Sequence, residues 1–425
     1  MRTFLLIWSG QMISILGSEI TNFAITIWAW ELTGQATSIS LIFLFTNTPP
    51  VIASTFAGII VDRFNRKYLM MLGDAIAGLS TLVILACYFS DNLSIWLLCI
   101  TGAVNSFFGY IQNLAYSASL SSLVAKKHYS RAAAMGSIKG FSAFILAPAL
   151  GGVLYYLVGL TGILTIDIAT FLVAFTTLAI SKVPQPPQQP NKDKSIKSQL
   201  TFGFRYIFKR PSLFAILIFL LVTNFLDNSI FGMAPAMMLA RSGNNSAVYA
   251  SIQTAFGVGG LVGAVVLSVW GGPKTRIHGL LAGNALAKMG LLILAFGQTP
   301  WIWCLGAFAG GLFIPVVLSS NQAIWLSKVN SDIQGRVFAS RYLIAQVATP
   351  IGLAISGPLA DHVFEPAMKT NSALARLLNG FVGEGPGAGM ALQCILFASL
   401  GICFSLGCYL VRNLRQVEVL IPDAE

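Results

Sequence analysis

Charged residues are scarce in this sequence of 425 residues. They make up only 10% of it, against about 25% in a typical soluble domain. Because 56% of the residues are hydrophobic, most side chains cannot face water, which excludes an ordinary soluble enzyme, a disordered chain and a secreted disulfide scaffold. The composition therefore predicts a polytopic membrane protein.

Patterns for metals, disulfides and nucleotides are also missing. The six cysteines form no Cys-x-x-Cys pair, and the three histidines are scattered along the chain. No Gly-x-x-x-x-Gly-Lys-Ser/Thr loop is present, so direct use of ATP is not expected. We expect no cofactor, no metal site and no enzymatic activity.

Long apolar runs are abundant, and each is long enough to cross a bilayer, which takes roughly 20 helical residues. Twelve such runs occur at about 4–30, 37–61, 68–89, 94–117, 132–156, 161–181, 213–240, 247–270, 279–297, 301–326, 337–360 and 389–411. The first is too long for a cleavable signal peptide and is expected to remain as a helix. These runs predict an all-α membrane protein of twelve transmembrane helices.

Basic residues cluster in alternate connections between these runs. The net charge of +11 could suggest nucleic-acid binding, but short basic clusters beside apolar runs are typical of the positive-inside rule. With a cytoplasmic N-terminus, 21 Lys and Arg residues fall on the inner side and three on the outer side. We therefore expect a protein of the cell membrane (inner or plasma) that binds no nucleic acid, with both termini in the cytoplasm.

A change in composition divides the chain in the middle. Residues 183–190 contain four prolines, which cannot continue a helix, and residues 192–210 alternate basic and aromatic side chains. That pattern favours a helix on the inner leaflet, with a plain solvated loop as the alternative. We expect an N-terminal six-helix bundle (1–182), a cytoplasmic linker with an interfacial helix (183–211) and a C-terminal six-helix bundle (212–425).

The two halves show weak internal similarity. Thr33-Gly34 corresponds to Ser242-Gly243, and Ala147-Pro148 corresponds to Thr349-Pro350, at offsets of 209 and 202 residues. Two parallel six-helix halves that enclose a site at mid-membrane are the arrangement of one large transporter class. The halves are therefore expected to form pseudo-symmetric bundles that rock around a central cavity.

The connection between helices 2 and 3 reads Gly58-Ile-Ile-Val-Asp62-Arg63-Phe-Asn-Arg66-Lys67. A small residue at Gly58 would let another helix approach closely, and Asp62 would offer a carboxylate to basic partners, so the loop could latch the cytoplasmic side. The alternative is a basic loop that only sets topology. The pattern resembles the signature loop of the major facilitator superfamily, with Asn in place of its second Gly. The corresponding loop after helix 8 lacks the acid, so any latch there must be built differently.

Helix 5 contains a run of small residues around a proline, Ala143-x-x-x-Ala147-Pro148-Ala-Leu-Gly151-Gly152. Pro148 is expected to bend the helix and the small residues to permit close helix contact, although ordinary packing would use them too. The run resembles the motif of drug antiporters in the same superfamily, with Ala at two of its Gly positions.

Over nearly its full length the chain is similar to the macrolide-efflux and enterobactin-exporter branch of that superfamily. Ile7-Trp-Ser-Gly-Gln11, Leu32-Thr-Gly34, Gly335-Arg-Val-Phe338 and Pro350-Ile-Gly352 carry this resemblance. It implies export of small amphiphilic compounds, such as drugs, siderophores or peptide-like metabolites, coupled to protons.

Ionisable residues within apolar helices are costly, about 2.5–3.5 kcal/mol each on insertion scales, and so indicate function. Glu19 is near the middle of helix 1, and Asp227 occupies almost the equivalent place in helix 7. We expect these acids to bind protons or a cationic substrate, with hydrogen bonds from Asn22, Asn224 and Asn228. A buried acid satisfied by its neighbours is the alternative.

Other polar residues complete the candidate site. Helix 4 carries Asn105, Tyr110, Gln112 and Asn113, which favour a wet cavity, but it lacks the Arg that many relatives use for proton coupling. Lys139 in helix 5 and Arg341 in helix 11 either pair with Glu19, Asp62 or Asp74 or reach the membrane interface. For Arg341, which is grouped with the gating loop, we favour the interface or a structural pairing. Lys288 and Asp167 are expected to be structural.

These expectations describe a secondary transporter for a small molecule that works by alternating access. It would act as a monomer in the lipid bilayer and use protons. Movement of lipid or lysolipid, or uptake instead of export, is the alternative within transport. A membrane sensor or assembly factor that transports nothing is the alternative from another class.

Overall fold

The computed structural model describes residues 2–125, 128–185, 196–368 and 373–422, and these are helical with short connections. The chain divides into two compact units. Unit 1 comprises residues 1–34 and 41–193, and unit 2 comprises residues 35–40 and 194–425.

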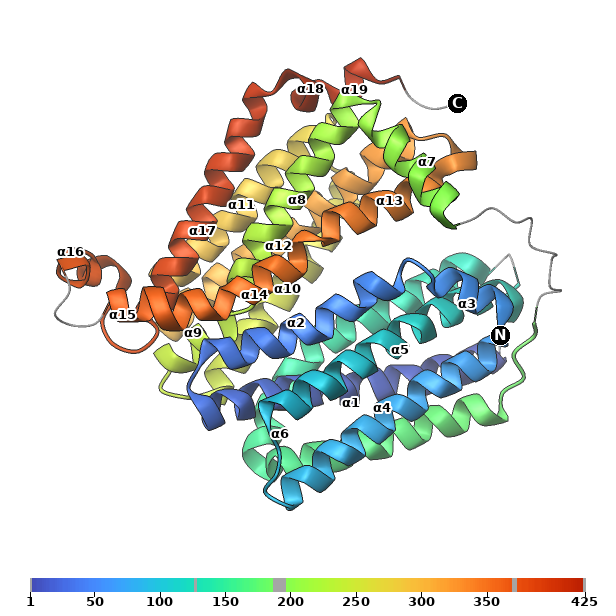
Figure 1. Cartoon of the computed structure of the whole chain (residues 1–425), viewed down its shortest axis with the longest axis horizontal. Helices are drawn as coiled ribbons and strands as arrows, with labels where there is room; N and C mark the ends of the chain where they lie inside the picture. Colours follow the sequence, from blue (N-terminus) through green and yellow to red (C-terminus); the bar gives the residue numbers. More distant parts are fainter. Residues whose placement is uncertain (1, 126–127, 186–195, 369–372, 423–425) are drawn as a thin grey trace. The chain divides into compact units, whose positions relative to one another are not determined.

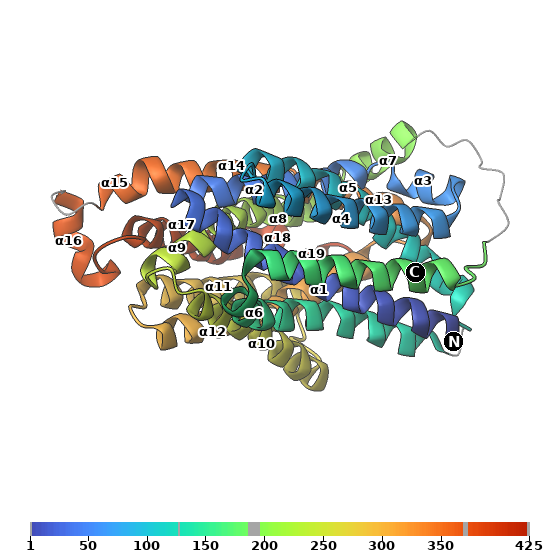
Figure 2. The same ribbon diagram turned by 90° about the horizontal axis from the view of Figure 1, so that it is seen from below.

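Unit 1 is built from long helices. They are α1 (Arg2–Thr33), α2 (Ala36–Ala53), α3 (Ala57–Arg63), α4 (Arg66–Phe89), α5 (Ile95–Leu123) and α6 (Tyr129–Ile180). The first residues of α2 belong to unit 2 and the rest to unit 1. Helix α1 runs alongside α6 (Figure 2), and Gly10 and Gly17 of α1 face Thr177 and Thr170 of α6.

Helix α6 contains two of the expected helices. Gly159 interrupts it with a φ of 64°, a left-handed conformation that glycine adopts without a steric penalty. Eleven segments of the described chain are long and apolar enough to cross a membrane, and one of them, Ile145–Ile180, spans this break. The described residues therefore confirm the expected twelve-helix membrane fold.

The second expected helix, 37–61, is not continuous as predicted. It ends at Ala53 as α2 and begins again at Ala57 as α3. Pro49 and Pro50 inside α2 lack backbone donors, which weakens the helical hydrogen bonding just before the break.

Unit 2 contains more and shorter helices. They are α7 (Ile196–Phe208), α8 (Pro211–Phe231), α9 (Ala234–Arg241), α10 (Ser246–Trp270), α11 (Arg276–Phe296), α12 (Pro300–Lys328), α13 (Gln334–Gln346), α14 (Ala348–Leu359), α15 (Glu365–Ala367), α16 (Ala373–Val382), α17 (Ala388–Gly407), α18 (Arg412–Arg415) and α19 (Val417–Leu420). Figure 1 shows α8, α11 and α17 running along one another, which positions the polar residues described below.

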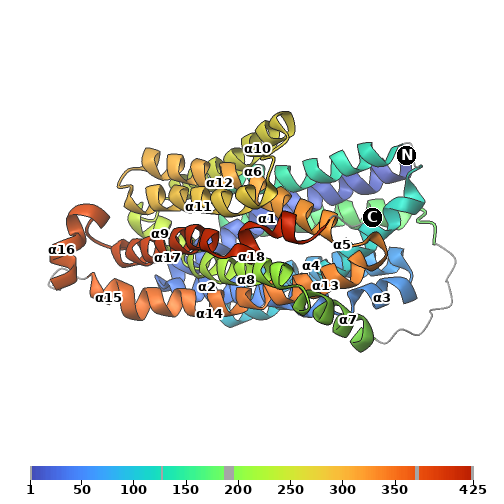
Figure 3. The same cartoon turned by 90° about the horizontal axis from the view of Figure 1, so that it is seen from above.

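Small residues let three helices of unit 2 touch through their backbones. Helices α10, α11 and α12 lie side by side (Figure 3). A Cβ atom built on Gly263 of α10 would lie 2.1 Å from the Leu312 carbonyl oxygen of α12, and one on Gly290 of α11 would lie 2.2 Å from the Gly310 amide nitrogen. Such contacts are typical of membrane helices, in which close van der Waals packing drives association.

The linker contains a helix, as the basic and aromatic pattern predicts. Helix α7 packs on α13, where a Cβ atom on Gly203 would lie 2.5 Å from the Arg336 carbonyl oxygen. Its other side exposes Phe208 and Arg205. Placement of this helix on the inner leaflet stays a prediction.

Candidate functional site

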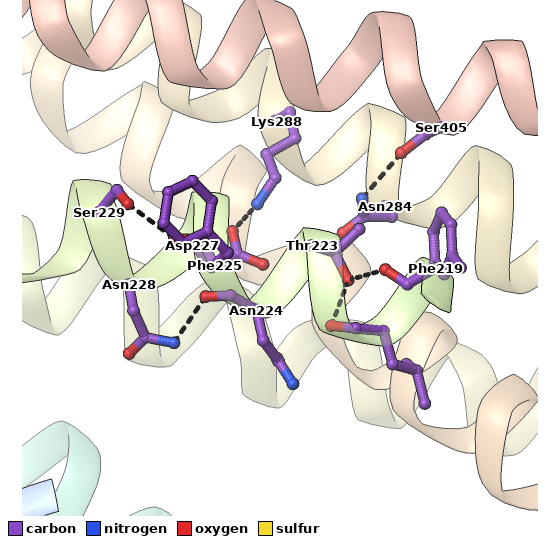
Figure 4. A network of polar contacts seen from close by, with 11 residues as sticks. Phe219, Thr223, Asn224, Phe225, Asp227, Asn228, Ser229, Asn284, Lys288 and Ser405 are labelled. Carbon is purple, nitrogen blue, oxygen red and sulfur yellow. Dashed lines mark hydrogen bonds and ion pairs between the residues drawn. The ribbon is translucent and has the colours of Figure 1, made fainter. Parts of the chain in front are cut away.

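A buried ion pair lies in the middle of unit 2 (Figure 4). The Lys288 ammonium of α11 contacts the Asp227 carboxylate of α8. The lysine side chain is 3% exposed and the aspartate side chain 42% exposed, so only the acid is accessible. Asp227 therefore does not stand alone, as its isolated place in the sequence suggested.

The other polar residues of α8 point to a different neighbour. The Asn224 amide donates to the Ala345 carbonyl oxygen at 2.9 Å, and the Asn228 amide donates to Thr349 Oγ1 at 3.2 Å. Both partners flank Val347, the junction of α13 and α14, where the helical ladder is irregular. The two asparagines thus connect α8 to the bend of helix 11, while Asp227 faces α11.

In unit 1, Glu19 and Asn22 lie one turn apart on α1, and both are exposed. The Glu19 carboxylate is within electrostatic range of Asp167, which is buried in the second half of α6. Asp167 accepts hydrogen bonds from Ser18 at 3.2 Å and from Thr81 at 2.8 Å. Two acids therefore influence each other electrostatically, one exposed and one buried among hydroxyl groups.

A second buried acid of unit 1 contacts the polar residues of helix 4. Asp74 of α4 accepts a hydrogen bond from Gln11 at 2.9 Å and another from Gln112 of α5. Gln112 therefore belongs to this network. Asn105 and Tyr110 are partly buried, like Gln112, and Asn113 is exposed.

The gating loop forms a network within unit 1. Asn65, which replaces the usual Gly, accepts a hydrogen bond from the Lys67 amide and so caps α4. The Arg66 guanidinium donates to the Ala118 carbonyl at the end of α5, and the Lys67 ammonium donates to the Ala179 carbonyl at the end of α6, each at 2.7 Å. The basic residues of the loop thus join three helix ends. Asp62 and Arg63 are exposed beside them.

The structure does not show the close approach expected at Gly58. This residue is exposed, and no atom lies within 4 Å of a Cβ atom built on it. Arg341 contacts Gln322 and the ring of Trp325 on α12, a structural pairing, and its grouping with the gating loop stays a prediction. The side chain of Lys139 lies outside the described residues.

The antiporter-like run of helix 5 packs on helix 1. Ala147, Gly151 and Gly152 are buried, and Pro148 is partly buried. A Cβ atom on Gly151 would lie 2.8 Å from Phe23, so a larger residue would push α1 and α6 apart. Close helix contact through small residues is observed here.

Two features escaped the sequence reasoning. Lys288 and Asp167 are more closely tied to the central acids than expected, and Asp74 was not placed in the site. The sequence did carry a signal for these three residues, because ionisable residues are rare inside apolar helices and each one is a candidate for function. For metals, the part of the chain that the structure describes contains no group of three His, Cys, Asp or Glu side chains able to hold an ion.

Comparisons with known proteins agree with this architecture. The sequence model of the Major Facilitator Superfamily matches residues 7–353. Macrolide efflux protein A of Streptococcus pyogenes is 25% identical over 98% of this chain and 97% of its own, and the multidrug efflux pump Tap of Mycolicibacterium fortuitum is 22% identical over 89% and 94%. A crystal structure of the nucleoside transporter NupG superposes with a TM-score of 0.70 at 14% identity, over 96% of this chain and all of that one.

Proposed function

The chain belongs to the Major Facilitator Superfamily, and from this premise we propose that it exports a small amphiphilic compound in exchange for protons. It is a multi-pass membrane transporter rather than an enzyme. Relatives named for macrolide and multidrug efflux support the direction and the cargo class, because they match over most of their own length.

One observation carries the proton coupling: an exposed carboxylate at mid-helix within electrostatic range of a second, buried carboxylate. Glu19 is exposed, whereas Asp167 is buried and bonded to Ser18 and Thr81. An acid within electrostatic range of another binds a proton more readily than an isolated one, since like charges oppose ionisation. The proton would leave when the acidic site opens to the other side of the membrane.

The ends of the helices indicate how access would alternate. We place the end with the Asp62–Lys67 loop in the cytoplasm, where its basic residues satisfy the positive-inside rule. The loop holds the ends of α4, α5 and α6 together, so unit 1 can move as one body. Rocking of the two bundles would then expose the Glu19 region to one side at a time.

A reconstituted system tests the proposal. Purified protein in proteoliposomes, with a pH-sensitive dye trapped inside, is given chloramphenicol, a neutral amphiphile, as the probe under an imposed proton gradient. We expect chloramphenicol to evoke a proton flux that Glu19→Gln largely removes. Glu31→Gln, an exposed acid near the end of the same helix, is the matched control and should retain the flux. The proposal is wrong if wild-type protein moves no protons with erythromycin, chloramphenicol or tetraphenylphosphonium, or if Glu19→Gln behaves as wild type.

A further inference from the structure

The Lys288–Asp227 pair differs in accessibility at its two ends. The ammonium comes from inside unit 2, and the Asp227 side chain points from α8 toward it (Figure 4). The aspartate side chain is nevertheless 42% exposed, on a face of unit 2 that Lys288 does not reach. A compound that reaches this face meets Asp227 first. The positive charge of the Lys288 side chain lies directly behind this acid.

The lysine is held in place by α17. A Cβ atom on Gly401 would lie 3.1 Å from Lys288 Cε and 3.4 Å from Cδ, so the absence of a side chain there makes room for the lysine stem. One turn before it on α11, the Asn284 amide donates to Ser405 Oγ at 2.8 Å and ties α11 to α17. The ammonium is therefore fixed next to Asp227 by packing from behind.

The Lys288–Asp227 pair presents no net charge to a compound that binds at this face. If a bound cation displaced the Lys288 ammonium from the Asp227 carboxylate, the lysine would stay charged and buried without a counter-charge, which is strongly unfavourable. A neutral amphiphile requires no such exchange. The pairing therefore discriminates by charge at the accessible face.

We propose that Lys288 is a specificity-determining residue: by neutralising Asp227, it makes this face of unit 2 accept neutral amphiphiles and disfavour cations. This inference rests on the proposed export function, and it assigns the selection of cargo charge to a residue that does not itself contact the cargo. The acid that exchanges protons would then be Glu19 in unit 1, since protonation of Asp227 would also leave the ammonium unpaired.

The test compares two probes of opposite character, tetraphenylphosphonium (a cation) and chloramphenicol (neutral), in export from cells and in binding to purified protein. Lys288→Met keeps the length of the stem and removes the charge. We expect it to raise the preference for the cation over the neutral probe at least about tenfold, because loss of a buried counter-charge is worth more than one decade of affinity. The double variant Asp227→Asn/Lys288→Met, which is neutral again, should return to the wild-type preference.

The alternative is that the Lys288–Asp227 pair only stabilises the fold, and this alternative leads to a different expectation. It predicts an equal loss for both probes in Lys288→Met, and that outcome would overturn the inference, as would a cation preference that persists in the double variant. Lys288→Arg, which retains the positive charge, is expected to keep the wild-type preference. If Lys288→Met folds poorly in cells, the same preference can be measured on the purified variant in detergent, as the rise in melting temperature that each probe causes. This binding measurement does not depend on protons, so a failure of proton-coupled export leaves it able to confirm or reject the role of Lys288.

Discussion

The two units join the ends of their helices in the same way but with different residues. In unit 1, Arg66 at the start of α4 donates to the Ala118 carbonyl near the end of α5. In unit 2, Arg276 at the start of α11 donates to the Ala323 carbonyl near the end of α12 at 3.2 Å. An arginine that begins the third helix thus holds the end of the fourth in both halves.

The two halves differ in the side chains that cap the starts of these third helices. In unit 1 the Gln185 side chain, which follows α6, accepts from the Arg66 amide at 3.2 Å. In unit 2 the Glu418 carboxylate of α19 accepts from the Ile277 amide at 3.1 Å, and the Lys328 ammonium donates to the Glu418 carbonyl at 2.9 Å. The start of α11 is therefore served by a carboxylate from the C-terminal segment, at a helix end that favours negative charge, whereas neutral amide side chains serve the start of α4.

The partners of the acids in the middle of the two bundles differ more than the contacts at the helix ends do. Asp167 of unit 1 is bonded to hydroxyl groups, whereas Asp227 of unit 2 is paired with an ammonium. The repeated architecture thus persists where the side chains have diverged. Similarity along the sequence consequently understates how alike the two halves are.

Neutralising the paired acid should have the largest effect. Asp227→Asn leaves the Lys288 charge buried without its partner, and we expect a loss of about 3–5 kcal/mol of stability. Asp167→Asn keeps a group that can accept from Ser18 and Thr81, so about 1 kcal/mol is expected there. Thermal unfolding in detergent checks the order. Equal losses in the two variants would contradict the distinction between the middles.

A methyl group added at a backbone contact should come next. In Gly263→Ala the new Cβ would lie 2.1 Å from the Leu312 carbonyl oxygen, which cannot move without shifting α12, and a loss of about 1–3 kcal/mol is expected. Gly17→Ala in unit 1 meets the side chain of Thr170, which can rotate, so a smaller loss is expected. Melting temperatures of the two variants, measured side by side, decide this; a greater loss for Gly17→Ala would show that unit 1 is the more tightly packed.

Removal of a cap should cost less again. Glu418→Ala deprives the Ile277 amide of its acceptor and is expected to lower stability by about 1 kcal/mol, the usual value for an N-cap. Gln185→Ala removes a neutral acceptor and should cost about half as much. Limited proteolysis of the C-terminal segment gives an independent readout. If Glu418→Ala leaves both melting and cleavage unchanged, the C-terminal carboxylate does not stabilise the start of α11.

What the sequence could predict follows from the physics behind each feature. The twelve helices were predictable because the thickness of the bilayer sets the length of each apolar run. The break between α2 and α3 was also within reach, since Pro49-Pro50 marks it. The partner of Lys288 was not, because it depends on which side chains of α11 point toward α8, and an apolar helix carries little periodic signal to tell its faces apart. Likewise, Glu418 lies 141 residues from Ile277, too far for any spacing rule.

The smallest effect is expected at Gly58. Gly58→Ala adds a methyl group to an exposed position with no atom within 4 Å, so stability should change by less than about 0.5 kcal/mol. Gly58→Leu separates two roles of this glycine. If Gly58 matters only when the transport cycle brings another helix against the loop, export of chloramphenicol by Gly58→Leu should fall while the melting temperature stays constant. Unimpaired export by Gly58→Leu would show that the loop works through Arg66 and Lys67 alone, as a clamp within unit 1 and not as a latch.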